Sequence, residues 1–180
     1  MKKITLVCIV ALGYNLNAQI YTSKKCNVKF FSETKMENID AENKVTRPIL
    51  NTKDGHFIVQ IFHTGFIFKS AFMQEHYNEN YMESEKYPDA KFDGLLVEKI
   101  DYTKDGTYTV SIAGKLSMHG VELPRTISGT IVIKGEVITM DSKFDIKVAD
   151  YKIKVPSLYV EKIAENIQVT FHSEMTPMKK

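Results

Sequence analysis

Apolar and polar residues alternate along much of the chain, most regularly between residues 108 and 118. A repeat of two over this stretch predicts a β-strand that has one apolar face and one wet face. Thr109, Ser111 and Lys115 fall on the wet side. The apolar side carries Tyr108, Val110, Ile112, Leu116 and Met118.

Less regular runs of the same kind occur elsewhere, and turn-forming residues separate them. An Asp-Gly pair precedes the run 57–62, and another stands between 93–102 and 108–118. Asp-Gly between two alternating runs is a strong hairpin signal. We therefore expect about eight strands in hairpin order. The remaining runs, the first two of them weaker, are 26–31, 44–50, 127–133, 137–140, 144–148 and 167–171.

One stretch has helical instead of alternating spacing. Met73, Tyr77 and Tyr81 lie four residues apart, which places them on one side of a helix over 70–81, and Ser70 is a suitable N-cap. Tyr87-Pro88 ends any further helix. A second short helix is expected within 155–164.

Many short antiparallel strands and one helix are typical of a sandwich or a closed barrel. The barrel is favoured, because closure removes the exposed edges that one-sided strands would otherwise leave. An interior formed by about eight strands holds packed side chains or one slim ligand. We predict an all-β fold, an eight-stranded antiparallel barrel with one or two short helices, as one domain over 19–180.

The first eighteen residues have the features of a secretory signal peptide. Lys2 and Lys3 precede an apolar run at 4–12, and the segment ends in the small residue Ala18. The apolar run is too short to cross a bilayer core of ~30 Å as a helix. A buried N-terminal helix is the alternative. We predict removal near Ala18 and a periplasmic or secreted mature chain without a transmembrane segment.

The net charge and the cysteine content of the mature chain bear on its partners and on its disulfide bonds. Without residues 1–18 the 24 Lys and Arg fall to 22, which equals the 22 Asp and Glu. A neutral chain gives no reason to expect a nucleic-acid partner. Cys26 is then the one remaining cysteine, so it forms no internal disulfide, and we expect it to be buried. The sequence leaves the oligomeric state open, a dimer included.

Recognised catalytic motifs are absent from the sequence. It contains no G-x-S-x-G, no H-E-x-x-H, no phosphate-binding glycine loop and no C-x-x-C. Five histidines are spread along the chain without metal-ligand spacing, so we expect neither a metal nor a cofactor. We predict that the chain is not an enzyme; the enzyme alternative requires that His76 or His119 has a carboxylate within hydrogen-bond reach.

The apolar faces of the strands remain as the candidate binding surface. Their side chains either line one cavity or fill the interior as an ordinary core, and the spacing leaves both alternatives open. The candidate ligand-binding residues are Phe57, Val59, Ile61, Phe66, Phe68, Phe92, Val110, Ile112, Leu116 and Met118.

Two motifs resemble those of the YceI-like family. Residues 73–84, followed by Tyr87-Pro88-Asp89-Ala90-Lys91-Phe92, are similar to that family's helix and its YP-x-A-x-F signature. Residues 114–124 look like its G-x-L-x-x-x-G-V-x-x-P hairpin, and the similarity extends over nearly all of 20–172. The resemblance implies a lipocalin-like eight-stranded barrel, periplasmic or extracellular, which in several members holds a polyisoprenoid or similar lipid.

The leading hypothesis is therefore a periplasmic or secreted protein that holds an isoprenoid or other long-chain lipid. The alternative is an envelope stress or interaction module that has a filled barrel and binds no ligand. The size of the interior cavity discriminates between the two.

Overall fold

Ten β-strands form the body of the molecule in the computed structural model, which describes residues 19–178. The signal peptide predicted for 1–18 and the predicted cleavage near Ala18 lie outside these residues. The strands are β1 (Ile20–Glu33), β2 (Asn38–Asn43), β3 (Ile49–Asn51), β4 (His56–Phe62), β5 (Phe66–Phe68), β6 (Asp89–Leu96), β7 (Gly106–Met118), β8 (Val121–Lys134), β9 (Val137–Lys147) and β10 (Asn166–Pro177).

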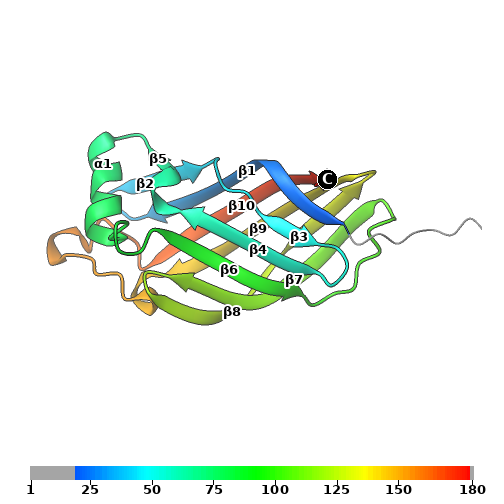
Figure 1. Ribbon diagram of the computed structural model, residues 1–180. Helices are drawn as coiled ribbons and strands as arrows, with labels where there is room; N and C mark the ends of the chain where they lie inside the picture. Colours follow the sequence, from blue (N-terminus) through cyan, green and yellow to red (C-terminus); the bar gives the residue numbers. More distant parts are fainter. Residues whose placement is uncertain (1–18, 179–180) are drawn as a thin grey trace, which may run out of the picture.

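The ten strands occupy eight positions in one antiparallel sheet. β2 and β3 pair with opposite ends of β1, so together they occupy one position in the sheet as a single interrupted strand. β5 pairs with β2 and β4 pairs with β3, so β4 and β5 together occupy the next position. β1 also pairs with β10, from Tyr21↔Pro177 to Phe31↔Gln168, and this ladder closes the sheet (Figure 1). The predicted eight-stranded antiparallel barrel is confirmed.

Three strand predictions were wrong in detail, one of them the run 93–102, because β6 begins at Asp89 and already ends at Leu96. The run 44–50 was expected to be one strand, but it is a loop followed by the short β3. The buried side chain of Asn43 explains the break, because its Oδ1 accepts hydrogen bonds from the backbone N–H groups of Val45 (3.0 Å) and Thr46 (3.2 Å). The runs 137–140 and 144–148, expected to be separate, belong largely to the continuous β9.

The helix over 70–81 is present and has two parts. The α-helix α1 (Ala71–His76) continues directly into a π-helical turn, η2 (Tyr77–Tyr81). Ser70 is the N-cap, and its side chain accepts a hydrogen bond from the backbone N–H of Met73 (3.4 Å).

The second predicted helix was wrong. Only a three-residue 3₁₀ turn, η4 (Ser157–Tyr159), forms within 155–164, beside the 3₁₀ turns η1 (His63–Gly65) and η3 (Val148–Tyr151) elsewhere. The hydrogen bonds from Tyr159 N to Pro156 O and from Lys162 N to Tyr159 O span three residues each, which is the tighter 3₁₀ pattern. No helix of residues 19–178 has the length and the apolar character that crossing a bilayer requires.

The interior is filled at one end of the barrel. The side chains that fill this end are Tyr21, Leu50, Ile131, Ile133, Ile138 and Met175, each at most 6% exposed. Cys26 lies among the buried residues as expected, and burial raises the pKa of its thiol to about 11. Both ends of the described chain lie at one end of the barrel, whereas α1 lies at the other (Figure 1).

Gly94 and Gly114 face each other across β6 and β7. A Cβ atom on Gly114 would lie 2.3 Å from the carbonyl oxygen of Asp93 and 2.6 Å from the Cα of Gly94. Because neither residue has a side chain, the two strands can approach closely here and curve around the interior.

Candidate ligand-binding cavity

The half of the barrel beneath α1 is hollow. It contains a cavity of about 480 Å³, whose wall includes residues from β1, β2 and β4 to β10. The boundary with the filled half is sharp along each strand. In β10 the wall takes in Ile167, Val169 and Phe171 but not Met175, and in β9 it takes in Met140 but not Ile138.

All ten candidate residues from the sequence lie on the wall of this one cavity. In β7 the alternation places Val110, Ile112, Leu116 and Met118 on the inside, where they are buried. Ala113 and Lys115, which lie between them in the strand, are exposed. The inward phase of β4 and β6 places Phe57, Val59, Ile61 and Phe92 in the same way, and β5 adds Phe66 and Phe68. The structure therefore brings the whole predicted set together.

A second group of wall residues was not among the candidate ligand-binding residues. Some of these residues belong to strands whose apolar and polar residues also alternate, although the alternation there was not used to select binding residues. Others lie in α1, η2 and the loop after β9, where no such alternation exists. The main members are Val28, Phe30, Ile39, Phe72, Met73, Tyr77, Tyr81, Ile127, Met140, Phe144, Ile146, Ile153, Val155, Tyr159, Ile163, Ile167, Val169 and Phe171.

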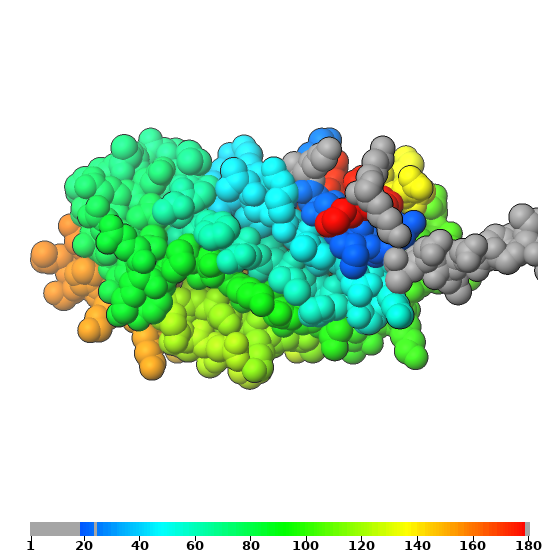
Figure 2. All heavy atoms as spheres, in the orientation of Figure 1, coloured from blue at the N-terminus to red at the C-terminus, as the bar shows by residue number. Residues whose placement is uncertain are grey.

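The helical segment α1–η2 covers the cavity as a roof, which Tyr77 holds in place. The Tyr77 ring lies 5.4 Å from the ring of Phe30 and 5.0 Å from that of Phe68, measured between centroids. The roof and the loop at 152–164 lie side by side at the end of the barrel (Figure 2), where the rings of His76 and Tyr159 are 6.5 Å apart. Aromatic packing therefore joins the roof to the barrel wall.

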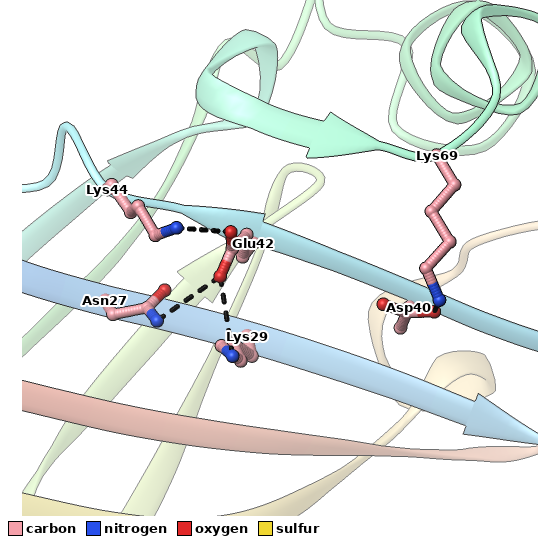
Figure 3. Close-up of polar contacts among 6 residues, drawn as sticks. All are labelled: Asn27, Lys29, Asp40, Glu42, Lys44 and Lys69. Atoms are coloured by element: carbon pink, nitrogen blue, oxygen red, sulfur yellow. Dashed lines mark hydrogen bonds and ion pairs between the residues drawn. The ribbon is translucent and has the colours of Figure 1, made fainter.

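Polar contacts on the outer surface lie beside the start of the roof. Lys69, next to the N-cap of α1, lies 2.7 Å from Asp40 of β2 (Figure 3). Beside this pair, Glu42 contacts Asn27, Lys29 and Lys44, and these contacts keep the pKa of its carboxyl below the usual value. Exposed pairs of this kind contribute little stability, so the aromatic packing of Tyr77, and not these contacts, holds the roof on the barrel.

One polar pair lies inside the hollow half. The Tyr77 hydroxyl is 3.0 Å from Nδ1 of His63, which is 2% exposed. Burial lowers the pKa of His63 to about 4, although the nearby Asp89 opposes the shift, and burial raises the pKa of Tyr77 far above its usual value. Both groups are therefore uncharged at neutral pH.

Charged side chains reach the cavity only at its margins. Among residues 19–178, the Asp, Glu, Lys and Arg residues on the wall are Glu37, Asp141 and Lys162. Glu37 and Lys162 lie 3.7 Å apart, and Asp141 points outward to His172, 2.7 Å away. An uncharged, largely apolar interior suits an apolar chain, since a charge placed there would lose its hydration without gaining a partner.

His119 has the carboxylate partner that the enzyme alternative requires. Its Nε2 is 2.9 Å from Glu83, and its Nδ1 is 3.1 Å from the backbone carbonyl of Tyr151. However, His119 is not part of the cavity wall, and the Tyr87 ring packs against it with centroids 4.5 Å apart. The pair therefore joins the segment after η2 to the turn between β7 and β8, and it does not face the cavity.

His76 lies on the cavity wall, and its ring packs against Phe72 at 3.9 Å. Within the described part of the chain, no hydrogen bond links His76 to a carboxylate, and no three His, Cys, Asp or Glu residues are placed to hold a metal ion.

A comparison with protein-family models matches the YceI-like domain to residues 22–175. The chain belongs to the YceI-like family. The two motifs that resembled this family meet in the structure, because Tyr87 of the first packs against His119 and Gly120 of the second. No curated protein matches the sequence.

Solved structures share this YceI-like fold at low sequence identity. A polyisoprenoid-binding domain from Saccharophagus degradans, implicated in plant cell wall breakdown, is 15% identical with a TM-score of 0.76 over 89% of this chain and 99% of that one. BcnA of Burkholderia cenocepacia is 16% identical with a TM-score of 0.69, over 84% of this chain and 96% of that one. The Campylobacter jejuni YCEI protein is 19% identical with a TM-score of 0.57 over the full length of both. At these identities the likeness establishes the fold alone.

Proposed function

We propose that this YceI-like protein binds an isoprenoid or other long-chain lipid in the hollow half of its barrel. The observation that carries the proposal is the apolar cavity of about 480 Å³. Its volume lies in the range of roughly 300–1,000 Å³ that is typical of small-molecule sites. The alternative, a module whose barrel is filled by side chains, requires an interior without such a space.

An apolar chain gains enough in this cavity to bind without polar recognition. Burial of one CH₂ group contributes about 0.8 kcal/mol, so a five-carbon isoprene unit contributes roughly 4 kcal/mol before the cost of ordering. A few units therefore give useful affinity. The polyisoprenoid-binding domain of Saccharophagus degradans, which has the same fold, supports an isoprenoid as the ligand class.

The experiment that tests this proposal is native mass spectrometry of protein purified from its own host, paired with solvent extraction. The expected result is a mass above that of the denatured chain by the mass of one lipid, and recovery of that lipid in the extract. A native mass equal to the denatured mass, with an extract free of lipid, would overturn the proposal.

We also propose that the mature chain acts in the periplasm or outside the cell, because residues 1–18 have the pattern of a signal peptide. Fractionation of the host and N-terminal sequencing test this part separately. The expected mature chain begins near residue 19 and is recovered outside the cytoplasm. An intact N-terminus in the cytoplasmic fraction would contradict it.

A further inference from the structure

The barrel wall is split between β8 and β9. The two strands pair only from Gly129↔Ser142 to Lys134↔Val137. Beyond this ladder, residues 121–128 of β8 pair with β7 alone, and residues 143–147 of β9 pair with β10 alone. We call the unpaired stretch between 121–128 and 143–147 the β8–β9 slit.

The cavity continues into this slit. Ile127 and Phe144, on the inner face of the wall, border the cavity and are only partly buried. Successive residues of a strand point to opposite faces, yet Ser128, the unpaired residue of β8 next to the ladder, borders the same cavity as its neighbour Ile127. The hollow therefore extends between the strands toward the outer surface.

Side chains, and not a backbone ladder, hold the slit together. At the ladder end, the Ser142 hydroxyl donates a hydrogen bond to the backbone carbonyl of Ser128 (2.9 Å). At the opposite end, His119 reaches the Tyr151 carbonyl. Between these two ends, among residues 19–178, one hydrogen bond crosses the slit: the guanidinium of Arg125 donates to the backbone carbonyl of Asp145.

We propose that the β8–β9 slit is the route by which an apolar chain enters and leaves the cavity, and that Arg125 keeps it shut. This inference rests on the proposed function, because it concerns the same cavity. Opening the slit breaks one hydrogen bond to a backbone carbonyl. Opening the roof instead would expose Tyr77 and the aromatic rings that surround it, which costs far more than one hydrogen bond.

The slit also suits the shape of a long chain. A chain that passes sideways between two strands can leave its polar end at the outer surface while its apolar part enters. Passage beneath the roof would bring any polar end past the packed rings of Phe30, Phe66 and Tyr77.

The test measures rates and affinity for one defined compound, a C15 isoprenoid alcohol that carries a dansyl group at its polar end. Stopped-flow fluorescence follows its uptake from zwitterionic vesicles and its release to an excess of empty vesicles. Arg125→Ala removes the contact across the slit, and Arg125→Lys retains a positive donor. Arg47→Ala is the matched control, because Arg47 also donates to backbone carbonyls but lies away from the slit, between β2 and β3.

The expected result is that Arg125→Ala raises uptake and release rate constants together by about three- to tenfold, which is the effect of one lost hydrogen bond. The dissociation constant stays within about twofold, Arg125→Lys gives intermediate rates, and Arg47→Ala matches the wild type. Equilibrium binding with unchanged rates for Arg125→Ala would overturn the slit as the route while leaving the proposed function standing. No binding of the compound by any of the four proteins would overturn both.

Discussion

The rings of Phe57 and Phe171 meet edge to face inside the barrel, with centroids 5.9 Å apart and planes at 87°. Phe57 comes from β4 and Phe171 from β10, and both line the cavity. Leu50 and Met175, in the filled half, are fully buried and are not part of the cavity wall. The aromatic pair therefore forms the floor of the cavity, and its position sets how far a ligand chain can reach.

Phe171→Ala should remove half of this floor. The free energy of unfolding should fall by about 3–5 kcal/mol, because a buried aromatic ring is lost and the space collapses only in part. Urea denaturation measures the change. Phe62→Ala is the matched control, because Phe62 is 50% exposed, and its loss should cost less than about 0.5 kcal/mol. Equal losses for the two variants would show that Phe171 does not pack as described.

A side chain that occupies the cavity should weaken binding without unfolding the protein. Ala90 lines the cavity from β6 and is 8% exposed, so Ala90→Phe should place a ring in the space proposed for the ligand. The affinity for the dansylated C15 isoprenoid should fall at least tenfold. Ala113→Phe makes the same change on the exposed face of β7 and should leave the affinity unchanged. If Ala90→Phe retains the affinity of the wild type, the ligand does not bind in this cavity.

The alternation of polar and apolar residues was sufficient to predict the barrel and part of the cavity wall. Val110, Ile112, Leu116 and Met118 were assignable because a strand that faces water on one side must alternate. Alternation does not reveal whether the inward side chains meet at the axis. The filled half around Leu50 and the hollow half use the same pattern, and only the three-dimensional structure separates them.

Features that depend on contacts distant in sequence could not be predicted. The break between β2 and β3 follows from Asn43, whose residue type is ordinary for a turn or a strand end. Its amide Nδ2 donates a hydrogen bond to the backbone carbonyl of Phe62 (3.0 Å), a contact that the sequence does not reveal. The β8–β9 slit leaves no trace in the pattern either. Residues 143–147 alternate like a fully paired strand, although β10 alone pairs with them.

The turn between β7 and β8 should be more sensitive to substitution than the turn between β8 and β9. Gly120 and Gly135 both have positive φ, at 73° and 57°, so alanine strains the backbone at either position. A Cβ on Gly120 would also lie 2.8 Å from the Tyr87 ring, whereas one on Gly135 meets nothing within 4 Å. Gly135→Ala should therefore cost about 1 kcal/mol, and Gly120→Ala should cost about 1–3 kcal/mol more.

Thermal and urea unfolding of these two glycine variants give the comparison. Both substitutions place alanine at a position with positive φ, so the cost of backbone strain is common to the two variants. The difference between their free energies of unfolding therefore reports the packing of Tyr87 against the turn. If both variants lose the same stability, the contact between the two family motifs does not contribute to the fold. A double variant with Tyr87→Ala should remove most of the extra cost of Gly120→Ala, because the ring that it meets is gone.

The buried His63 should make the protein less stable as the pH falls from 6.5 to 4. Burial lowers its pKa from 6.5 to about 4 in the folded chain. Below pH 6.5 the unfolded chain therefore takes up a proton that the folded chain does not, and unfolding becomes easier. The full stability is present above pH 6.5, and the loss reaches at most roughly 3 kcal/mol near pH 4.

Urea unfolding between pH 4.5 and 7 checks this dependence. Carboxylates with lowered pKa begin to contribute only near and below their unperturbed values, which are 3.8 for Asp93 and 4.5 for Glu42, so the range above pH 5 reports His63. His63→Gln keeps a polar group beside Tyr77 but does not titrate, and it should flatten the curve over this range. A slope that persists in His63→Gln would assign the proton uptake to another group and would contradict a buried, neutral His63 beneath the roof.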